Sequence, residues 1–344
     1  MLVSLYMIAY NEEKCLDEIL GDILAQSYPH ADTEIVVTDN GSTDRTYEIL
    51  CGFKEKYINE YRDIKILKND CNTIPVGLNV CIKNTTGDIV VRVDAHASIA
   101  PDFIEESVAC LEGTHTGIRE YACGGMRPTY TVENDGMSAM LLSVEESRFG
   151  ASAANYRGAL VRTYVDTVFH AAYRREVIEK VGLYDERLLR TEDNNYNWRI
   201  RQAGYKICFE PRIKSKQQIR SSLPKMLKQK NGNGYWIGYT LGITPECISL
   251  FQLIPMLFVL GSVICAVLAA FGLSIFGALM WGAYTLCSLV FSIKAVIDAP
   301  RVYIHHLLMP LVFLLMHFSY GIGTIKGIAV MLGEKITKKG ESKK

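Results

Sequence analysis

Acidic and imidazole side chains follow apolar runs at several points of the chain. The stretch "IVVRVDAHASI", residues 89–99, leads from an apolar run into Asp94 and His96. "AYNEE" follows the apolar run at 2–8, and "TDNGSTD" follows the run at 34–38. Asp and His can both ligate a divalent metal. They can equally form an ordinary strand terminus. The two interpretations can be distinguished only from the strands and helices around these residues.

The elements that would position these residues alternate between strand and helix. Apolar runs predict strands at 2–8, 34–38, 63–68 and 88–93. Amphipathic stretches predict helices near 13–27, 43–56, 74–85 and 101–112, the last with Pro101 in its first turn. This alternation predicts an α/β fold with a mostly parallel, doubly wound sheet. In such a sheet, ligands bind beyond the carboxyl ends of the strands, where the polar residues above lie.

The polar residues at these strand ends favour a nucleotide bound with a metal. No GxGxxG or Walker loop follows any of the predicted strands, which argues against a dinucleotide dehydrogenase or a P-loop kinase. The crevice is acidic, so it can bind a diphosphate only if a divalent cation screens the repulsion. Carboxylates can also accept hydrogen bonds from a base N–H or from ribose hydroxyls.

Charge and cysteine usage restrict the class of protein further. The net charge is zero, but the region from Lys294 onward carries eight basic and three acidic residues, a balance of +5, so the preceding residues carry −5. A mildly acidic front part is a poor nucleic-acid binder. The ten cysteines form no CxxC pair, which favours free thiols in a reducing compartment. The first residues contain no basic region and are expected to form a strand, not a signal peptide.

The rear of the chain is apolar enough to enter a membrane. No charged residue lies between Cys247 and Ile293, which predicts two spans at about 250–271 and 275–293 with a turn near Gly272–Ser274. Residues 305–325 form a third apolar segment before a basic tail; a buried core hairpin is the alternative for all three. With the front domain in the cytoplasm, the positive-inside tendency predicts that 305–325 is re-entrant or interfacial.

Four motifs taken together resemble a known family. "VSLYMIAYNEE", "VVTDNGSTD", "TGDIVVRVDAH" and "TEDNNYNWRIRQAG", in this order and spacing, resemble family 2 glycosyltransferases with a GT-A fold. The resemblance covers about residues 1–236, so we expect a glycosyltransferase domain over 1–236 and a membrane region over 237–344. Residues 165–207 further resemble the ExoA-type members, which act on lipid-linked oligosaccharides in succinoglycan and other exopolysaccharide synthesis.

The resemblance implies roles on the donor side. Ala9, Tyr10 and Glu12 would line the nucleoside pocket, and Asp39 would contact the base. Asp94, also among the nucleotide-binding residues, would form with His96 the metal-binding DxD motif, in which His replaces the last Asp. The cofactor is expected to be Mn²⁺ or Mg²⁺; imidazole suits manganese, whereas magnesium prefers oxygen ligands.

On the acceptor side, the resemblance makes Asp193 the general base and Glu192 an orienting residue. One carboxylate takes the acceptor proton in an inverting transfer, although two acids at a helix N-terminus are also favoured by the helix dipole. Gln229 and Trp236 are similar to a Q-x-x-R-W region, with Gly232 where relatives tend to have Arg. Trp236 would stack on an acceptor sugar or anchor the chain at a membrane interface.

Two arginines, Arg127 and Arg157, are candidates for phosphate contact, with solvation at the surface as the favoured alternative. The predicted function is a membrane-anchored, inverting transfer of a sugar from a nucleotide diphosphate sugar, a UDP-hexose, to a lipid-linked saccharide at the cell inner membrane. A polyprenyl-phosphate sugar synthase and a non-catalytic membrane scaffold are the alternatives. No nucleic-acid partner is expected.

Overall fold

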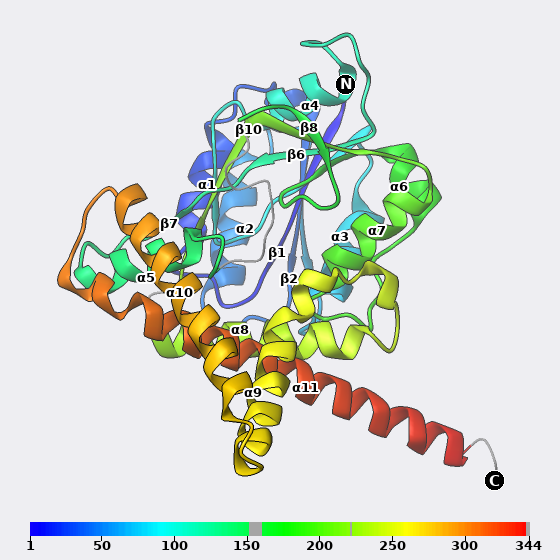
Figure 1. Cartoon of the computed structure of the whole chain (residues 1–344). Coiled ribbons are helices and arrows are strands. Elements are labelled where there is room, and N and C mark those ends of the chain that lie inside the picture. Colours follow the sequence, from blue (N-terminus) through cyan, green and yellow to red (C-terminus); the bar gives the residue numbers. More distant parts are fainter. Residues whose placement is uncertain (151–159, 221, 342–344) are drawn as a thin grey trace. The chain divides into compact units, whose positions relative to one another are not determined.

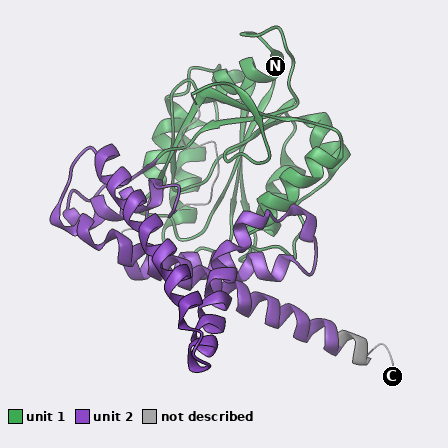
Figure 2. Cartoon of the chain, in the orientation of Figure 1, with its two compact units in different colours: residues 1–128, 155–217 green, residues 129–154, 218–344 purple. Residues whose placement is uncertain are grey.

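The computed structural model describes residues 1–150, 160–220 and 222–341, with the backbone alone for 338–341. The chain forms two compact units, coloured separately in Figure 2. Unit 1 consists of Met1–Pro128 and Asn155–Gln217, and unit 2 of Thr129–Ala154 and Gln218–Lys344. The predicted domain boundary at residue 236 falls inside a helix of unit 2, Leu223–Thr240. Each unit is described by itself below.

The strands and helices are numbered in chain order, and Figure 1 labels most of them. The strands are β1 (Val3–Ala9), β2 (Thr33–Asp39), β3 (Asp63–Lys68), β4 (Ile89–Arg92), β5 (Ala97–Ile99), β6 (Ala122–Met126), β7 (Thr129–Tyr130), β8 (Thr163–Val165), β9 (Ala172–Arg174) and β10 (Ile207–Gln218). The helices of unit 1 are α1 (Leu16–Leu24), α2 (Thr46–Tyr57), α3 (Ile74–Asn84), α4 (Phe103–Glu112), α6 (Arg175–Val181) and α7 (Glu192–Gln202). The helices of unit 2 are α5 (Gly136–Glu146), α8 (Leu223–Thr240), α9 (Ile254–Ala270), α10 (Ser274–Asp298) and α11 (Met309–Glu341).

The sheet of unit 1 is parallel in its first half and mixed in its second. Its strands follow the order β3-β2-β1-β4-β9-β6-β10-β5, and β8 also pairs with β10. Strands β3, β2, β1 and β4 are parallel neighbours, whereas β9 is antiparallel to both β4 and β6. The predicted α/β fold is confirmed, with parallel pairing among β3, β2, β1 and β4 and mixed pairing in the rest of the sheet. The antiparallel β9 is decisive for the site, because it begins beside the carboxyl end of β4.

Helices cover both faces of this sheet, because its central strands are apolar on both sides. Val3, Leu5 and Met7 of β1 belong to one core with residues of α1, α2 and α4. Tyr6 points the other way and belongs to a second core with residues of α3, α6 and α7. Neighbouring residues of a strand face opposite sides of a sheet, so an unbroken apolar run supplies both cores at once.

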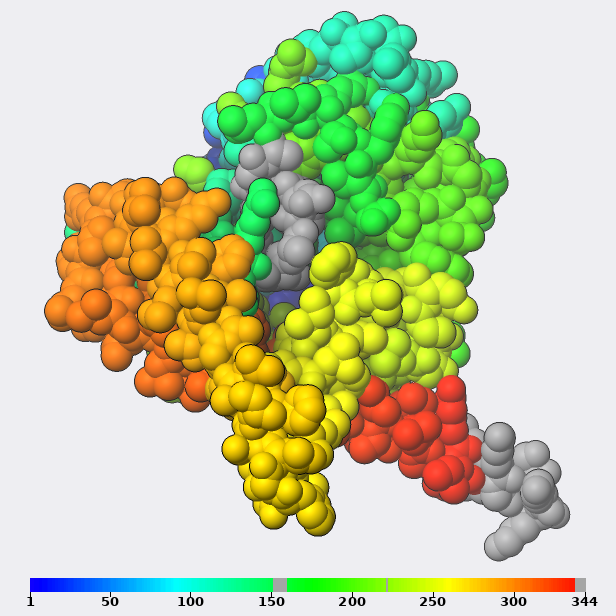
Figure 3. Space-filling model, in the orientation of Figure 1, coloured from blue at the N-terminus to red at the C-terminus, as the bar shows by residue number. Residues whose placement is uncertain are grey.

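Unit 2 contains three helices long and apolar enough to cross a membrane. They occupy Leu250–Ala270, Ser274–Asp298 and Ile304–Thr337. The most apolar parts of the first two are each only 6% buried, and the gold-to-orange hairpin of α9 and α10 is open over much of its surface in Figure 3. The predicted turn falls at Gly272, whose φ of 80° suits glycine. The third helix continues beyond the predicted 305–325 into the basic tail, since α11 ends at Glu341.

Helix α11 differs from α9 and α10 in being packed along one side against α8. The apolar window of the third helix is 39% buried. A Cβ on Gly234 of α8 would lie 2.0 Å from the carbonyl oxygen of Tyr320, and a Cβ on Gly327 of α11 would lie 2.0 Å from that of Tyr235. Asn231 Nδ2 donates to the carbonyl of Ser319 at 2.8 Å. Glycine therefore allows the two helix backbones to touch.

Candidate functional site

The loops that follow β1 and β2 are tied together at the carboxyl edge of the sheet. Ala9 and Asp39 are register partners at the ends of these strands. Asn11 has a φ of 54°, and its side-chain oxygen accepts from the Thr43 N–H at 2.8 Å. The Asn11 N–H donates to Ser42 Oγ at 3.0 Å. These hydrogen bonds from the turn after β2 therefore support the loop after β1.

The residues predicted to line a nucleoside pocket lie in and beside this support. Tyr10 is 43% exposed, whereas Ala9 and Asp39 are buried. Glu12 lies in the same loop, and its Oε1 is 3.0 Å from Nδ1 of His96, which follows β4. The structure thus joins Glu12, predicted as a nucleoside residue, to His96, predicted as a metal ligand.

One buried arginine, Arg92, joins the donor-side and acceptor-side carboxylates. It is the last residue of β4, and its side chain is 10% exposed. Its Nη1 donates to Oδ1 of Asp193, and its Nη2 lies 3.4 Å from Asp94 Oδ1 and 3.8 Å from Glu192 Oε1. Burying three carboxylates together would be costly if the positive charge of Arg92 did not offset their negative charges. Arg92 is therefore the centre of the site.

Helix α7 supplies two of these carboxylates from its first turn. Glu192 and Asp193 begin the helix, and Tyr196 and Ile200, one and two turns later, are buried in the second core. The apolar side of α7 thus holds the acidic turn against Arg92. Asp193 keeps 24% of its side-chain surface exposed, whereas Glu192 keeps 5%. A molecule arriving from solvent can reach Asp193 more readily than Glu192.

The surroundings shift the pKa values of two carboxyl groups in this cluster, Asp94 and Glu192, in opposite directions. Burial opposes ionisation of Asp94, but Arg92 and His170 outweigh it and hold the pKa of Asp94 well below its usual range. For Glu192, burial and the neighbouring Asp193 raise the pKa well above its usual range, against the influence of Arg92. Burial likewise opposes the charge of Arg92, yet the carboxylates of Asp193 and Asp94 hold its pKa well above its usual range. Burial and the neighbouring charges therefore favour the ionised form of Asp94 and the neutral form of Glu192.

A second histidine, His170, approaches Asp94 from β9. Its Nε2 lies 3.4 Å from Asp94 Oδ2, and its Nδ1 lies 2.8 Å from Ser215 Oγ. The side chain is 1% exposed. Burial lowers the pKa of His170, although Asp94 raises it, and Arg127 and Arg92 lower it further. Sequence reasoning did not single out His170 or Arg92.

The donor set around Asp94 fits a divalent cation in its chemistry. An ionised carboxylate and imidazole nitrogens are ligands of manganese and similar metals. Across the residues that the structure describes, no group of three or more His, Cys, Asp or Glu side chains is arranged to hold a metal ion. A cation at Asp94 would therefore need ligands from the substrate or from water, as is usual where Mg²⁺ carries a nucleotide phosphate.

Three further residues predicted from the sequence lie in the described parts of the chain. Gln229 and Trp236 belong to α8 of unit 2, where Trp236 packs against Tyr239 with ring centroids 5.3 Å apart. Arg127 is buried, not solvated, and its guanidinium lies 3.8 Å from the centroid of the Phe169 ring. Arg157 falls outside the described residues.

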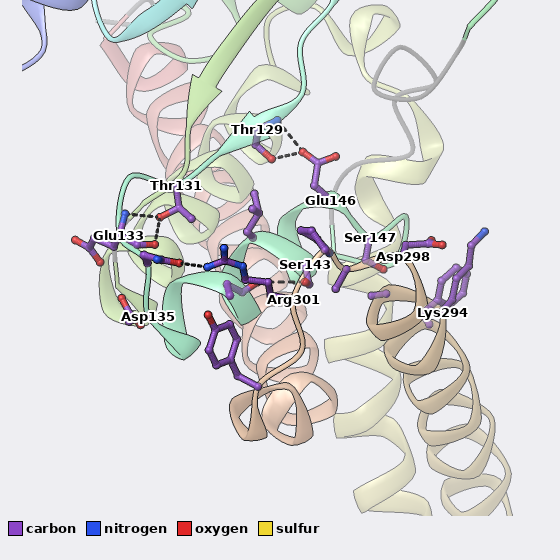
Figure 4. A pocket seen from close by; sticks show the side chains of 18 of the residues that line it. Thr129, Thr131, Glu133, Asp135, Ser143, Glu146, Ser147, Lys294, Asp298 and Arg301 are labelled. Carbon is purple, nitrogen blue, oxygen red and sulfur yellow. Dashed lines mark hydrogen bonds between the residues drawn. The ribbon is translucent and has the colours of Figure 1, made fainter.

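Unit 2 contains a cavity of about 570 Å³ that sequence reasoning did not predict (Figure 4). It is lined by residues from 129–135, from α5 and the two residues after it, from the end of α10 and from 299–303. Arg301 Nη1 donates to Asn134 Oδ1 at 3.0 Å there, and Thr129 N–H donates to Glu146 at 2.8 Å. The lining mixes acidic and basic side chains, so it has no clear preference for either charge. None of the residues predicted from the sequence lines it.

Comparisons with known proteins concern the family and the fold of the chain. The sequence profile described as "Glycosyl transferase family 2" matches residues 4–182, more than half of the chain. A relative from Methanococcus voltae, "Dolichyl N-acetyl-alpha-D-glucosaminyl phosphate 3-beta-D-2,3-diacetamido-2,3-dideoxy-beta-D-glucuronosyltransferase", is 26% identical over 329 residues, which cover 95% of this chain and 97% of the relative.

Two further proteins are similar over much of their length. The "Succinoglycan biosynthesis protein ExoA" of Rhizobium meliloti is 25% identical over 236 residues, covering 67% of this chain and 68% of that protein. The solved structure of the mannosyltransferase PcManGT from Pyrobaculum calidifontis, in complex with GDP-Man and Mn²⁺, has a TM-score of 0.62 at 18% identity. It covers 94% of this chain and 86% of that one, which shows a shared fold.

Proposed function

The chain belongs to glycosyltransferase family 2, and on this premise we propose that it transfers a sugar from a nucleotide diphosphate sugar, a UDP-hexose, to a lipid-linked saccharide. The Arg92 cluster carries this proposal. It brings Asp94, a donor-side anion, and Asp193, an accessible acceptor-side carboxylate, onto one guanidinium. A glycosyl transfer needs both functions within reach of one anomeric carbon.

The residues divide into a donor side and an acceptor side. Ala9, Tyr10, Glu12 and Asp39 bind the nucleoside from the joined loops after β1 and β2. Asp94 and His96 would hold a divalent cation, Mn²⁺ or Mg²⁺. That cation would offset the charge of the diphosphate as it leaves.

Asp193 acts on the acceptor as the general base. Its carboxylate accepts the proton of the acceptor hydroxyl while that oxygen attacks the anomeric carbon opposite the leaving diphosphate, which inverts the configuration. Arg92 fixes the orientation of this carboxylate, and the buried Glu192 beside it helps to orient the same arginine. Gln229 and Trp236 are proposed to contact the acceptor.

Support for a lipid-linked acceptor comes from unit 2 and from the relatives. Three helices are long and apolar enough to cross a membrane. The name of the Methanococcus voltae relative specifies a dolichyl phosphate that carries a sugar. We place the protein at the cell inner membrane with unit 1 in the cytoplasm, where nucleotide sugars are made.

The test uses the full chain purified in detergent with a panel of nucleotide sugars, with and without Mn²⁺. One set of reactions contains a polyprenyl-linked saccharide, and a matched set contains bare polyprenyl phosphate. We expect metal-dependent transfer to the saccharide only, with Asp193→Asn as the inactive control. Transfer to bare polyprenyl phosphate alone would identify a polyprenyl-phosphate sugar synthase. Absence of both transfer and donor hydrolysis would indicate a non-catalytic scaffold.

A further inference from the structure

The pairing of β4 with β9 places a histidine beside the carboxylate that follows β4. These strands are antiparallel, with Val91 opposite Ala172, and the Arg92 N–H donates to the Ala171 carbonyl at 2.9 Å. A residue just before β9 must therefore lie beside a residue just after β4. His170 and Asp94 occupy these two positions.

The backbone at His170 adopts a left-handed conformation. Its φ is 43°, and in the described parts of the chain only Asn11 shares a positive φ among residues other than glycine. Such conformations are uncommon, although His and Asn tolerate them better than most residues, and they concentrate at functional sites. Asn11 lies in the loop after β1, which also contains Glu12, the partner of His96.

The distance between the two side chains fits two ligands of one cation better than a hydrogen bond. His170 Nε2 and Asp94 Oδ2 are 3.4 Å apart. A hydrogen bond from N–H to O is typically about 2.7–3.2 Å. With metal–ligand bonds of about 2.1 Å, neighbouring ligand atoms are about 3.0 Å apart in an octahedron and about 3.4 Å in a tetrahedron.

The surroundings of the imidazole leave Nε2 directed at the carboxylate. Within the described residues, this buried nitrogen makes no hydrogen bond of usual geometry, and it faces Asp94 Oδ2. On the other side of the ring, Nδ1 lies 2.8 Å from Ser215 Oγ, and Ser215 Oγ donates to the Met126 carbonyl at 3.4 Å. When Nδ1 carries the proton and donates it to Ser215 Oγ, the free electron pair of the ring lies on Nε2. This is the arrangement of a histidine ligand with its supporting partner.

We propose that His170, through Nε2, is a ligand of the divalent cation that Asp94 binds. The inference rests on the proposed function only in giving Asp94 a cation. It adds a nitrogen ligand from β9 that the DxD-like motif does not contain. The remaining coordination positions would be open to His96, to diphosphate oxygens and to water.

Pulsed electron paramagnetic resonance of the Mn²⁺-loaded full chain tests this directly, because nitrogen nuclei of coordinated imidazoles modulate the manganese signal. The decisive sample is His96→Asn, which removes the other candidate imidazole and leaves His170 in place. We expect the nitrogen modulation to persist in His96→Asn and to change when histidine is labelled with ¹⁵N. Loss of the modulation in His96→Asn would overturn the proposal.

Binding of Mn²⁺ alone provides a second readout. Asn tolerates the left-handed backbone at this position, so His170→Asn is expected to fold while its Kd for Mn²⁺ rises by about tenfold or more. His115→Asn is the matched control, since His115 also pairs with a carboxylate, Glu106 Oε2 at 3.0 Å. The control should keep the Kd of the wild type. An unchanged Kd in His170→Asn would also contradict the proposal.

These readouts separate the inference from the proposed function. Persistent nitrogen modulation in a protein that transfers no sugar would support the metal ligand and reject the transferase proposal. Sugar transfer by a protein whose bound Mn²⁺ shows no nitrogen from His170 would do the reverse.

Discussion

Arg92 donates through Nη1 to Oδ1 of Asp193, a residue 101 positions later in the sequence. The same guanidinium lies 3.4 Å from Asp94 Oδ1 through Nη2. The end of β4 and the start of α7 are thus joined by one side chain. The predictions that follow begin with this contact.

Arg92→Lys should lower kcat far more than it changes the KM for the donor. Lysine keeps a positive charge but has one nitrogen where the guanidinium uses two, so it cannot hold Asp193 and Asp94 together. We expect a loss of about tenfold to 100-fold in kcat, because a misplaced base costs this much. Steady-state kinetics with a nucleotide sugar measure it. A lysine variant with unchanged kcat would show that Arg92 does not position the base.

Asp193→Asn and Glu192→Gln should differ sharply, although the residues are neighbours. Asn cannot accept the proton of the acceptor, so transfer should fall by about 100-fold or more while the donor still binds. Gln imitates a neutral carboxylic acid, which is the form that the raised pKa of Glu192 favours. Glu192→Gln should therefore keep most of the activity. Transfer rates at pH 7 distinguish the two, and the opposite order would assign the base to Glu192.

Glu34→Gln should destabilise unit 1 in a pH-dependent way. Glu34 is buried and accepts hydrogen bonds from Ser4, Thr86 and Lys65. Burial raises its pKa, but these contacts outweigh it and leave the pKa below the usual value. Removing the charge should cost about 2 kcal/mol at pH 7, the scale of a charge-assisted hydrogen bond.

The sign of this pH effect follows from the lowered pKa of folded Glu34. Its stabilising effect is complete above the unfolded pKa of about 4.3 and disappears as the pH falls through the lower folded value. Thermal midpoints of wild type and Glu34→Gln should therefore differ at pH 7 and converge in acid. Glu48→Gln, at an exposed pair with Arg45, is the control and should leave the midpoint unchanged. If the difference between the two midpoints persisted in acid, the negative charge of Glu34 would not be its source.

The basic end of α11 should be inaccessible from outside the cell. We predict that the third apolar helix is interfacial or re-entrant, since one side of α11 packs on α8. A membrane-impermeant maleimide applied to intact cells should label Ser274→Cys, in the turn before α10, but not Lys335→Cys. Strong labelling at position 335 would mean three complete spans.

The first half of unit 1 could be predicted closely from the sequence. The predicted strand at 63–68 coincides with β3, and the predicted helix at 74–85 exceeds α3 by one residue. Both depend on local apolar periodicity, which a single sequence displays. The third apolar helix was predicted too short, because Lys326 and Glu334 interrupt its apolar character and its partner α8 lies far away in the sequence.

Only part of the candidate site could be predicted from the sequence. Asp94 stands out in the sequence because it follows an apolar run. Asp193 stands out because it lies at the start of a predicted helix. Arg92 looked like one polar residue inside an apolar strand, and its role depends on carboxylates from α7. His170 lies in an irregular stretch, and no local pattern indicates that β9 would run antiparallel beside β4. Pairing between distant strands is the information that the sequence did not display.

The contact between α8 and α11 determines the order in which unit 2 can be completed during synthesis. Helix α8 leaves the ribosome before α9 and α10, but Gly323 and Gly327, which meet the α8 backbone, follow both of them. The face of α8 that packs against these glycines therefore stays exposed while α9 and α10 are synthesised. A chain that stops before α11 would keep its apolar hairpin and lose the partner of α8, so unit 2 is finished only when its last helix has been synthesised.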